Sequence, residues 1–197
     1  LFHTSSSIYV PAMPPPAGTA FIKQTVGGSG VRRCQFFTFQ QIAADVDRLH
    51  AFFDLENRGV AVAAISCAHS YGLTMTVLQT LLHGVPLCWA PQPFAQPLME
   101  ALRPHARAFL PGVPAMWKAW LMGQVSFENV SLAISAGSPL TPELATMARE
   151  KHGLQLRNLY GTSECGAISC DDVLLPGVEA ESAAEGRLLV HSSSTGL

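Results

Sequence analysis

One stretch of the sequence decides the fold class: LAISAGSPLTPELATMAREKHGLQLRNL, residues 132–159. Its first apolar run, Leu132 to Ser135, predicts a short strand. Thr141-Pro142 then places an N-cap and a first-turn proline before a helix that Gly153 ends. The run from Leu154 to Leu159 predicts a second strand. A strand, a helix and another strand in this order are typical of a parallel sheet covered by helices.

The same alternation continues toward the N-terminus. Thr38 followed by Gln41 is a capping box, and apolar residues recur at helical spacing as far as Phe53, which predicts an amphipathic helix. The run from Val60 to Ser66 is apolar without alternation and predicts a strand covered on both faces. Further helices are expected near 74–83, 97–103 and after Pro114, and further strands near 87–90 and 108–110. We therefore predict an α/β fold of mainly parallel strands covered by helices, with binding loops at the carboxyl ends of the strands.

Composition and charge exclude several classes of protein. Of the 197 residues, 48% are hydrophobic and 13% are charged, which excludes a disordered chain. The net charge is −2 and the sequence has no basic block, so nucleic acid is not an expected partner. The five cysteines form no Cys-x-x-Cys pair, which favours reduced thiols and a cytoplasmic protein. Residues 59–99 lack Asp, Glu, Lys and Arg, but glycines, prolines and polar residues interrupt them, so no membrane span is expected.

The beginning of the sequence differs in composition from the rest. Four prolines between residues 11 and 16 disfavour a helix, so we expect an extended Pro-rich lead-in at 1–19 and a folded domain at 20–197. Leu1 stands where a Met would begin a complete chain, and the first ten residues lack the features of a signal peptide. We therefore expect a piece of a longer polypeptide.

A glycine-rich loop, TVGGSGVRR at residues 25–33, follows a short apolar segment. Glycines let backbone N–H groups turn toward an anion, hydroxyls add donors and an arginine adds positive charge. The loop is neither a Walker A loop nor a dinucleotide fingerprint. By itself it indicates either a phosphate site or a flexible turn, and the candidate ligands are Thr25, Gly27, Gly28, Ser29, Gly30 and Arg33 or Arg32.

Two other stretches offer chemistry after predicted strands. The loop NLYGTSE, residues 158–164, supplies an amide for a base edge, a ring for stacking, hydroxyls for phosphate and a carboxylate for Mg²⁺. The alternative is a solvated polar turn with a packed tyrosine. The loop SAGSPL, residues 135–140, has small residues that permit close approach of a flat ligand, but by itself it is only a turn.

Taken in order, these loops resemble the AMP-binding, adenylate-forming family, which includes acyl-CoA synthetases, aryl-CoA ligases and nonribosomal peptide adenylation domains. The glycine-rich loop resembles the family's Thr-Ser-Gly-Ser/Thr-Thr-Gly-x-Pro-Lys/Arg, with Val26 and Arg32 as departures. Residues 135–140 are similar to Ser-Gly-Gly-Ala-Pro-Leu, and residues 158–164 to Asn-x-Tyr-Gly-x-Thr-Glu. HSYGL at 69–73 looks like the family's His-x-Tyr-Gly segment, and LPGVP at 110–114 looks like its Gly-Val-Pro-Thr segment.

The resemblance implies part of the large N-terminal domain of an adenylate-forming enzyme and a two-step reaction. A carboxylate attacks the α-phosphate of ATP, pyrophosphate leaves, and the acyl group then passes to the thiol of CoA or of carrier-protein phosphopantetheine. Implied cofactors are ATP, Mg²⁺ and CoA. The implied catalytic residues are Arg33, His69 and Glu164, of which Glu164 would bind the metal; the implied nucleotide-binding residues are Thr25, Gly27, Gly28, Ser29, Gly30, Gly137, Ser138, Asn158, Tyr160, Gly161, Thr162 and Ser163.

Within this resemblance, the substrate and the activity of the chain stay open. The uncharged stretch near His69 favours an apolar or aromatic carboxylic acid, and an acyl carrier protein is a possible partner. The sequence ends before the family's ribose-binding Asp and its small C-terminal domain, so we expect an incomplete ligase.

Two other functions are weighed. The departures in the phosphate loop and the early end of the sequence make a nucleotide-binding pseudoenzyme the first alternative. A serine hydrolase using Ser163, Asp171 or Asp172, and His191 is a weaker one, because the Gly161-x-Ser163-x-Cys165 motif lacks its final glycine.

Overall fold

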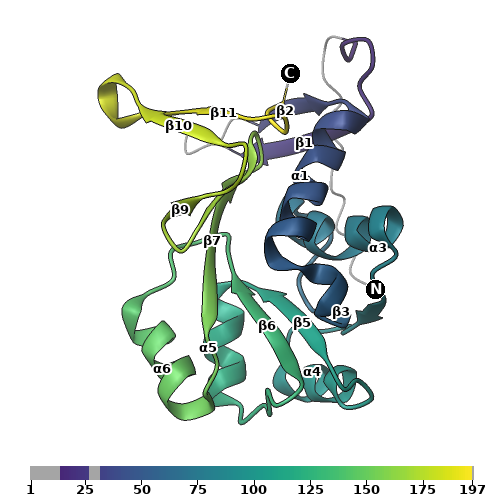
Figure 1. Ribbon diagram of the computed structural model, residues 1–197, viewed down its shortest axis with the longest axis vertical. Coiled ribbons are helices and arrows are strands. Elements are labelled where there is room, and N and C mark those ends of the chain that lie inside the picture. Colours follow the sequence, from purple (N-terminus) through teal and green to yellow (C-terminus); the bar gives the residue numbers. More distant parts are fainter. Residues whose placement is uncertain (1–13, 27–31, 197) are drawn as a thin grey trace.

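The computed structural model describes residues 14–26 and 32–196, and its centre is a seven-stranded sheet (Figure 1). The strands lie in the order β4-β3-β5-β6-β7-β8-β9, and those from β4 to β7 are parallel. The last two strands pair antiparallel. The bounds are β3 Val60–Ala63, β4 Leu87–Trp89, β5 Ala108–Gly112, β6 Val130–Ser135, β7 Leu156–Thr162, β8 Gly166–Cys170 and β9 Val173–Leu174. The prediction of a mainly parallel α/β fold is confirmed.

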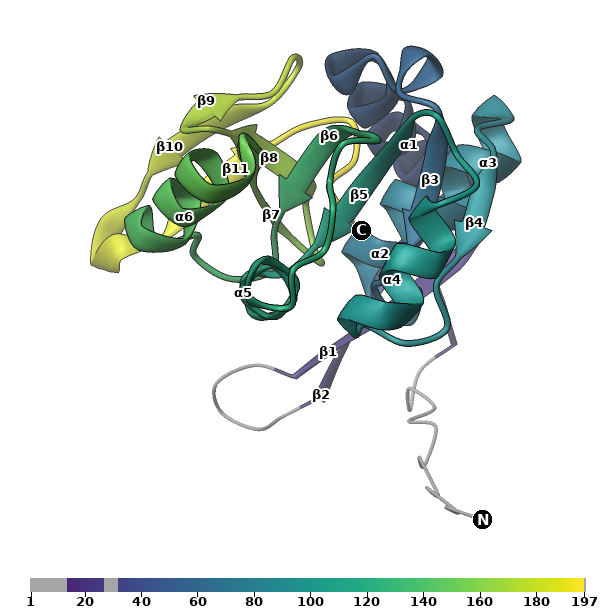
Figure 2. The ribbon, with the colours of Figure 1, turned by 90° about the horizontal axis from the view of Figure 1, so that it is seen from below.

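Helices cover both faces of this sheet, as Figure 1 shows for α1 on one side of β6 and α5 and α6 on the other. The longer ones are α1 Phe39–Phe53, α4 Ala95–Leu102, α5 Pro114–Met122 and α6 Pro142–His152. A broken helix follows β3 and consists of α2 Ser70–Gly72, a π-helical turn Leu73–Val77 and α3 Leu78–His83. Figure 2 shows the same layers after a quarter turn.

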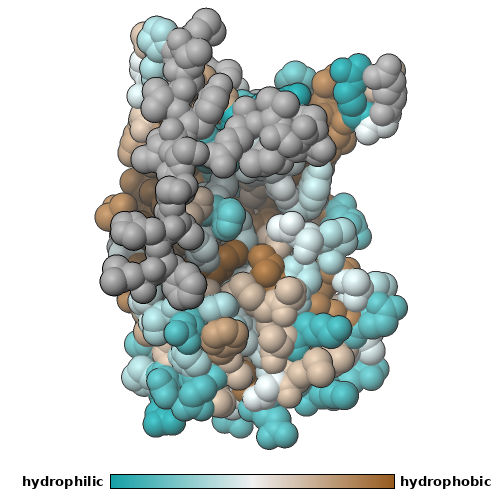
Figure 3. All heavy atoms as spheres, turned by 180° about the vertical axis from the view of Figure 1, so that it is seen from behind, coloured by the Kyte–Doolittle hydropathy of each residue, from teal (hydrophilic) through white to brown (hydrophobic). Residues whose placement is uncertain are grey.

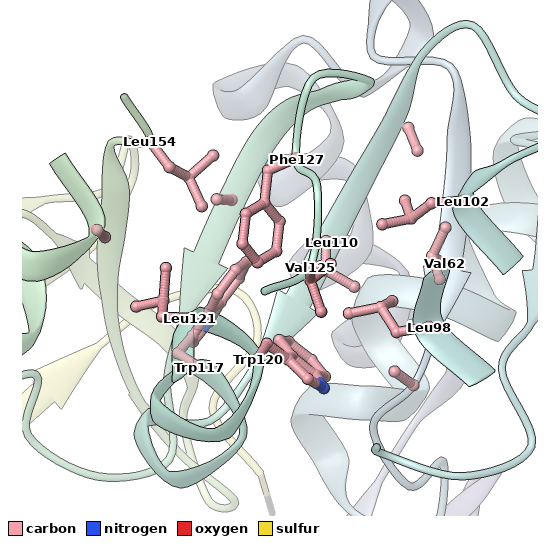
Figure 4. Close-up of a cluster of buried hydrophobic side chains, with 14 of the residues drawn as sticks. Val62, Leu98, Leu102, Leu110, Trp117, Trp120, Leu121, Val125, Phe127 and Leu154 are labelled. Carbon is pink, nitrogen blue, oxygen red and sulfur yellow. The ribbon is translucent and has the colours of Figure 1, made fainter. Parts of the chain in front are cut away.

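Buried hydrophobic side chains of the described residues form three clusters, and alternation along β5 separates the two larger ones. Ala108 and Leu110 of β5 pack with α4, α5 and α6 in the first core, whose centre holds Trp117 and Trp120 (Figure 4). Phe109, between them in sequence, packs with α1 in the second core. Successive residues of a strand point to opposite faces, so an unbroken apolar strand is buried on both sides, as the sequence predicts.

Both helix starts predicted from N-cap residues are confirmed, Thr38 for α1 and Thr141 for α6. The Thr38 side chain accepts a hydrogen bond from the Gln41 backbone N–H, and the Gln41 side chain accepts one from the Thr38 N–H. Thr141 caps α6, and Gly153 ends it in a left-handed conformation. The strand predicted to end at Leu159 is longer in the structure: residues 160–162, expected in the loop that follows, belong to β7, because the strand continues by pairing with β8.

Two hairpins lie outside the sheet, at the upper end of Figure 1. The first consists of β1 Phe21–Val26 and β2 Arg32–Phe37, and the second of β10 Glu179–Ser182 and β11 Leu188–His191. Short 3₁₀ turns occupy Leu55–Asn57 and Ala184–Gly186. None of the helices in the described ranges combines the length and apolar character that crossing a membrane requires. Most of the predicted lead-in at 1–19 lies outside the described residues, and its extended form stays a prediction.

Candidate functional site

A cavity of about 1330 Å³ lies at the carboxyl ends of the parallel strands. Its wall is built from β1, from α1, from the segments that follow β3, β4, β5 and β6, and from the turn between β7 and β8. This is the edge at which an open α/β sheet carries ligands. In the view from behind, hydrophobic side chains gather near the middle and hydrophilic ones lie along the lower edge of the molecule (Figure 3).

Five of the predicted site residues, from three of the predicted motifs, meet in this cavity. His69, Gly137, Thr162 and Ser163 all line it, together with Gly161. A Cβ on Gly161 would lie 2.5 Å from the backbone oxygen of Gly166, so only glycine permits this close approach of β7 and β8. The cavity therefore unites residues that are far apart in the sequence.

His69 is exposed at the cavity wall rather than buried in the core. The segment after it is fixed by two close contacts. The Tyr71 hydroxyl donates to the Ile134 carbonyl oxygen at 3.1 Å, and burial raises the pKa of Tyr71. A Cβ on Gly72 would lie 2.2 Å from the Ser66 carbonyl oxygen. These contacts hold His69 in place without using its ring.

The two ends of the glycine-rich loop are brought face to face. Thr25 and Arg33 are directly opposite each other in the β1–β2 hairpin, so their side chains lie on the same face. Arg33 is exposed and Thr25 is half-buried. Gly27, Gly28, Ser29 and Gly30 lie outside the described residues, and their role as phosphate ligands stays a prediction.

Glu164 lies in the turn between β7 and β8 and is half-buried. Its backbone oxygen accepts a hydrogen bond from Gly196 N–H at 2.9 Å. Within residues 14–26 and 32–196, its carboxylate makes no hydrogen bond or ion pair, and no three metal-binding side chains cluster. A single free carboxylate fits Mg²⁺, which binds through one or two carboxylates together with substrate phosphates.

The remaining predicted nucleotide ligands do not line the cavity. Ser138 is exposed in the turn after β6. Asn158 and Tyr160 lie on the opposite face of β7 from Leu159, because strand residues alternate. Asn158 donates its backbone N–H to Asp171 Oδ1 at 2.8 Å, and Tyr160 is 49% exposed. These side chains therefore lie outside the cavity on the adjoining surface.

The AMP-binding enzyme family matches residues 4–192 of the sequence. This chain belongs to that family. A curated relative, 4-hydroxybutyrate–CoA ligase 1 of Metallosphaera sedula, is 33% identical over 58 residues, which are 28% of this chain and 10% of the ligase.

Solved structures show the fold of this family member independently. ATP-bound MatB from Rhodopseudomonas palustris superposes with a TM-score of 0.81 at 20% identity, over 90% of this chain and 40% of that one. The o-succinylbenzoate CoA synthetase MenE from Bacillus subtilis, in complex with ATP and magnesium, gives 0.80 at 16% identity, over 90% of this chain and 42% of that one. The chain thus spans about two fifths of the length of these synthetases.

Two charged residues of this AMP-binding chain that belong to none of the sequence motifs, Lys23 and Asp45, also line the cavity. The signals were present. Lys23 precedes Thr25 by two residues and so shares its strand face. Asp45 falls between Ile42 and Leu49 on the apolar stripe of α1 and is 4% exposed.

The residues of the hydrolase alternative are kept apart. Ser163 precedes β8 and Asp171 follows it, and the strand has five residues, a length of about 16 Å. Asp171 is paired with Arg157. His191 is in β11 opposite Glu179. The geometry of this AMP-binding chain therefore does not favour a Ser–Asp–His triad.

Proposed function

We propose that this chain binds ATP, Mg²⁺ and a carboxylic acid as the nucleotide- and acyl-binding part of an AMP-forming acid–thiol ligase. The observation that carries the proposal is the cavity, in which His69, Gly137 and Ser163 meet at the carboxyl edge of the sheet. Thr25 and Arg33 do not line the cavity themselves but are paired in the hairpin whose residues Phe21 to Gln24 do. Family membership and the fold shared with MatB and MenE support the same reaction class.

In this reaction the acid's carboxylate oxygen attacks the α-phosphorus of ATP, and the bond to the β-phosphate oxygen breaks to release pyrophosphate. A thiol of CoA or of carrier-protein phosphopantetheine then attacks the acyl carbon of the acyl-adenylate and AMP leaves. No protein nucleophile is needed, so the residues act by positioning and by neutralising charge. A bound Mg²⁺ neutralises charge on the phosphate oxygens.

Each proposed role follows from the chemistry of the side chain. Arg33 and Thr25 donate hydrogen bonds to β- and γ-phosphate oxygens, and Ser163 donates to phosphate from the opposite wall. Glu164 holds Mg²⁺. His69 lies beside the acid's carboxylate and orients it. Asn158 and Tyr160 contact adenine, with Gly137 and Ser138 lining the surface near it.

The cavity wall favours an apolar or aromatic acid. Ile65, Trp89, Val113, Met116 and Ala136 supply apolar lining, which suits the hydrocarbon part of a small molecule. The acceptor thiol would be that of CoA, or that of an acyl carrier protein as a macromolecular partner. A cytoplasmic location agrees with the use of ATP and CoA.

Titration calorimetry with MgATP tests nucleotide binding directly on this chain. Arg33→Ala and Glu164→Ala should each weaken binding about tenfold or more, since hydrogen bonds to charged groups contribute about 1.5–3 kcal/mol. Arg103→Ala and Glu150→Ala are matched controls, because both residues are exposed on other elements. Absence of binding by the unmodified chain at millimolar MgATP would refute the proposal.

The acid is tested by ATP–pyrophosphate exchange with a panel of aliphatic, aromatic and dicarboxylic acids. Exchange driven by aliphatic or aromatic acids supports the proposed substrate class, whereas exchange driven only by dicarboxylic acids contradicts it. ATP binding without exchange for any acid would instead favour the nucleotide-binding pseudoenzyme.

A further inference from the structure

The Lys23 ammonium in the cavity has no role in the function described so far. Lys23 is half-buried in β1, and its Nζ lies 4.3 Å from the centre of the Phe37 ring. Phe37 is fully buried. Within the described part of the chain, this ammonium makes no hydrogen bond and no ion pair within 4.0 Å. An ammonium has three donors, and contact with the face of a ring leaves donors free for a ligand.

The nearby Asp45 does not account for this lysine, because it has partners of its own. Asp45 Oδ1 accepts a hydrogen bond from Ala167 N–H at 2.9 Å and lies 3.7 Å from Arg48 Nη1. Arg48 in turn donates to Pro176 O and Ser194 Oγ, both at 3.0 Å. The buried carboxylate and guanidinium thus form a structural pair, and Lys23 adds a second positive charge beside it.

The hairpin register shows where this charge points. Phe21, Lys23 and Thr25 alternate with Ile22 and Gln24 in β1. The first three are half-buried and the other two are exposed, so Lys23 and Thr25 face the interior of the molecule. Lys23 and Thr25 are two positions apart in the strand, a separation of about 7 Å.

Arg33 completes a row on the same face. It is directly opposite Thr25, as Gln35 is opposite Lys23, and opposite residues share a face. Two cationic side chains and one hydroxyl therefore lie on one face of the hairpin, with Lys23 at the inner end of the row.

Contacts of Gly196 bring the turn that carries Glu164 toward the Phe37 end of the hairpin. A Cβ on Gly196 would lie 3.0 Å from the Phe37 ring, and the Gly196 N–H is bonded to Glu164 O. Burial lowers the pKa of Lys23, and the charges of Asp45 and Glu164 partly oppose this. A desolvated ammonium on the same face as the two proposed phosphate ligands is suited to an oxyanion.

We propose that Lys23 is a further phosphate-binding residue, whose ammonium contacts an oxygen of the ATP triphosphate inward of Thr25 and Arg33. The inference rests on the proposed function, because it assumes that the hairpin face binds ATP. The same chemistry would also suit the carboxylate of the acid. Because Lys23 lies in one row with Thr25 and Arg33, we favour phosphate. The test distinguishes the phosphate of ATP from the carboxylate of the acid.

Calorimetry on the chain with MgATP, inorganic triphosphate and adenosine tests this role. Lys23→Met should weaken binding of ATP and of triphosphate about tenfold to a hundredfold, the effect of one charged hydrogen bond, and leave adenosine unchanged. Lys23→Arg, which keeps the charge, should recover most of the loss. Lys118→Met is the matched control, since Lys118 is exposed on α5, and thermal melting checks folding of each variant.

The outcomes separate this inference from the proposed function. If Lys23→Met binds triphosphate within twofold of the unmodified chain while Arg33→Ala does not, Lys23 is not a phosphate ligand and the ATP site stands. If Lys23→Met weakens only binding of the acid, measured in a separate titration, the lysine binds a carboxylate and the inference is wrong. If the unmodified chain binds neither ATP nor triphosphate, both proposals fail.

A second measurement needs no variant and so does not depend on how Lys23→Met folds. Lysines of the unmodified chain are acetylated with an amine-reactive ester, with and without MgATP, and the extent at each site is read by mass spectrometry. ATP should protect Lys23 several-fold and leave Lys118 unchanged. Equal acetylation of Lys23 under both conditions would overturn the inference.

Discussion

Replacing Arg48 with Met should destabilise the chain strongly at neutral pH. The Arg48 side chain is 5% exposed and lies 3.7 Å from the carboxylate of Asp45, whose side chain is 6% exposed. It also donates to Pro176 O and to the hydroxyls of Ser193 and Ser194. Removing one partner of a buried ion pair costs about 3–5 kcal/mol. The free energy of unfolding of a domain is only about 5–15 kcal/mol, so the loss is a large share of the total.

The cost should shrink as the pH falls. Burial already raises the pKa of Asp45 above its unfolded value, although Ala167 N–H, Lys23 and Arg48 lower it. Protonation of a group whose folded pKa is raised stabilises the folded state as the pH falls toward the unfolded pKa. Loss of the guanidinium raises this pKa further, so Asp45 in the variant protonates at a higher pH and the penalty of its buried charge disappears.

Urea unfolding followed by circular dichroism, at pH 7 and at pH 5, measures both effects. Arg103→Met changes an exposed residue at the end of α4. Its free energy of unfolding should stay within about 0.5 kcal/mol of that of the unmodified chain at both pH values. Arg48→Lys keeps the positive charge but lacks the planar guanidinium, so its loss of unfolding free energy should lie between those of Arg48→Met and Arg103→Met. A loss below about 1 kcal/mol for Arg48→Met, or a loss that is the same at both pH values, would refute the account of this pair.

Three further substitutions test separate parts of the structure by urea unfolding. Thr38→Ala removes the capping-box hydroxyl and should cost about 1 kcal/mol; an unchanged midpoint would contradict the cap. Gly72→Ala places a Cβ 2.2 Å from Ser66 O and should cost more than about 2 kcal/mol, a result that full stability of the variant would disprove. Ser135→Ala removes a buried hydroxyl without a partner among the described residues and should be neutral or stabilising by about 1 kcal/mol, whereas clear destabilisation would reveal a missed contact.

The elements that the sequence predicts well are those whose signals are local. The capping box at Thr38 and Gln41 specifies the start of α1, and the left-handed Gly153 specifies the end of α6. The two-faced strand at Val60 is visible because its apolar run has no polar residue. Local hydrogen bonds and side-chain period determine each of these features, so a short window of sequence contains the necessary information.

The parts that the sequence does not reveal depend on partners elsewhere in the chain. Residues 160–164 look like a loop after the strand predicted at 154–159, yet pairing with β8 extends β7 to Thr162. The sequence places Lys23 on the strand face of Thr25 and Asp45 on the apolar stripe of α1, but only the packing of β1 and α1 brings the two charges to one cavity. Tertiary contacts of this kind override local preference.

The turn that carries Glu164 shows how a local signal can serve a distant site. Gln41 caps α1 through its side-chain oxygen, and its nitrogen donates to Thr195 O at 2.6 Å. Next to Thr195, Ser194 Oγ donates to Cys165 O and Gly196 N–H donates to Glu164 O. The capping glutamine thus fixes the segment that holds the β7–β8 turn against α1.

A single side chain therefore couples the start of α1 to the proposed metal ligand. A capping box needs only a Gln or Glu at the third helical position, and both offer the oxygen that accepts the Thr38 N–H. Only the amide of Gln41 also supplies a donor for Thr195 O. A glutamate at this position would preserve the helix start and lose the second bond, so the helix start is satisfied by either residue, whereas the bond to the segment beside the Glu164 turn needs the amide.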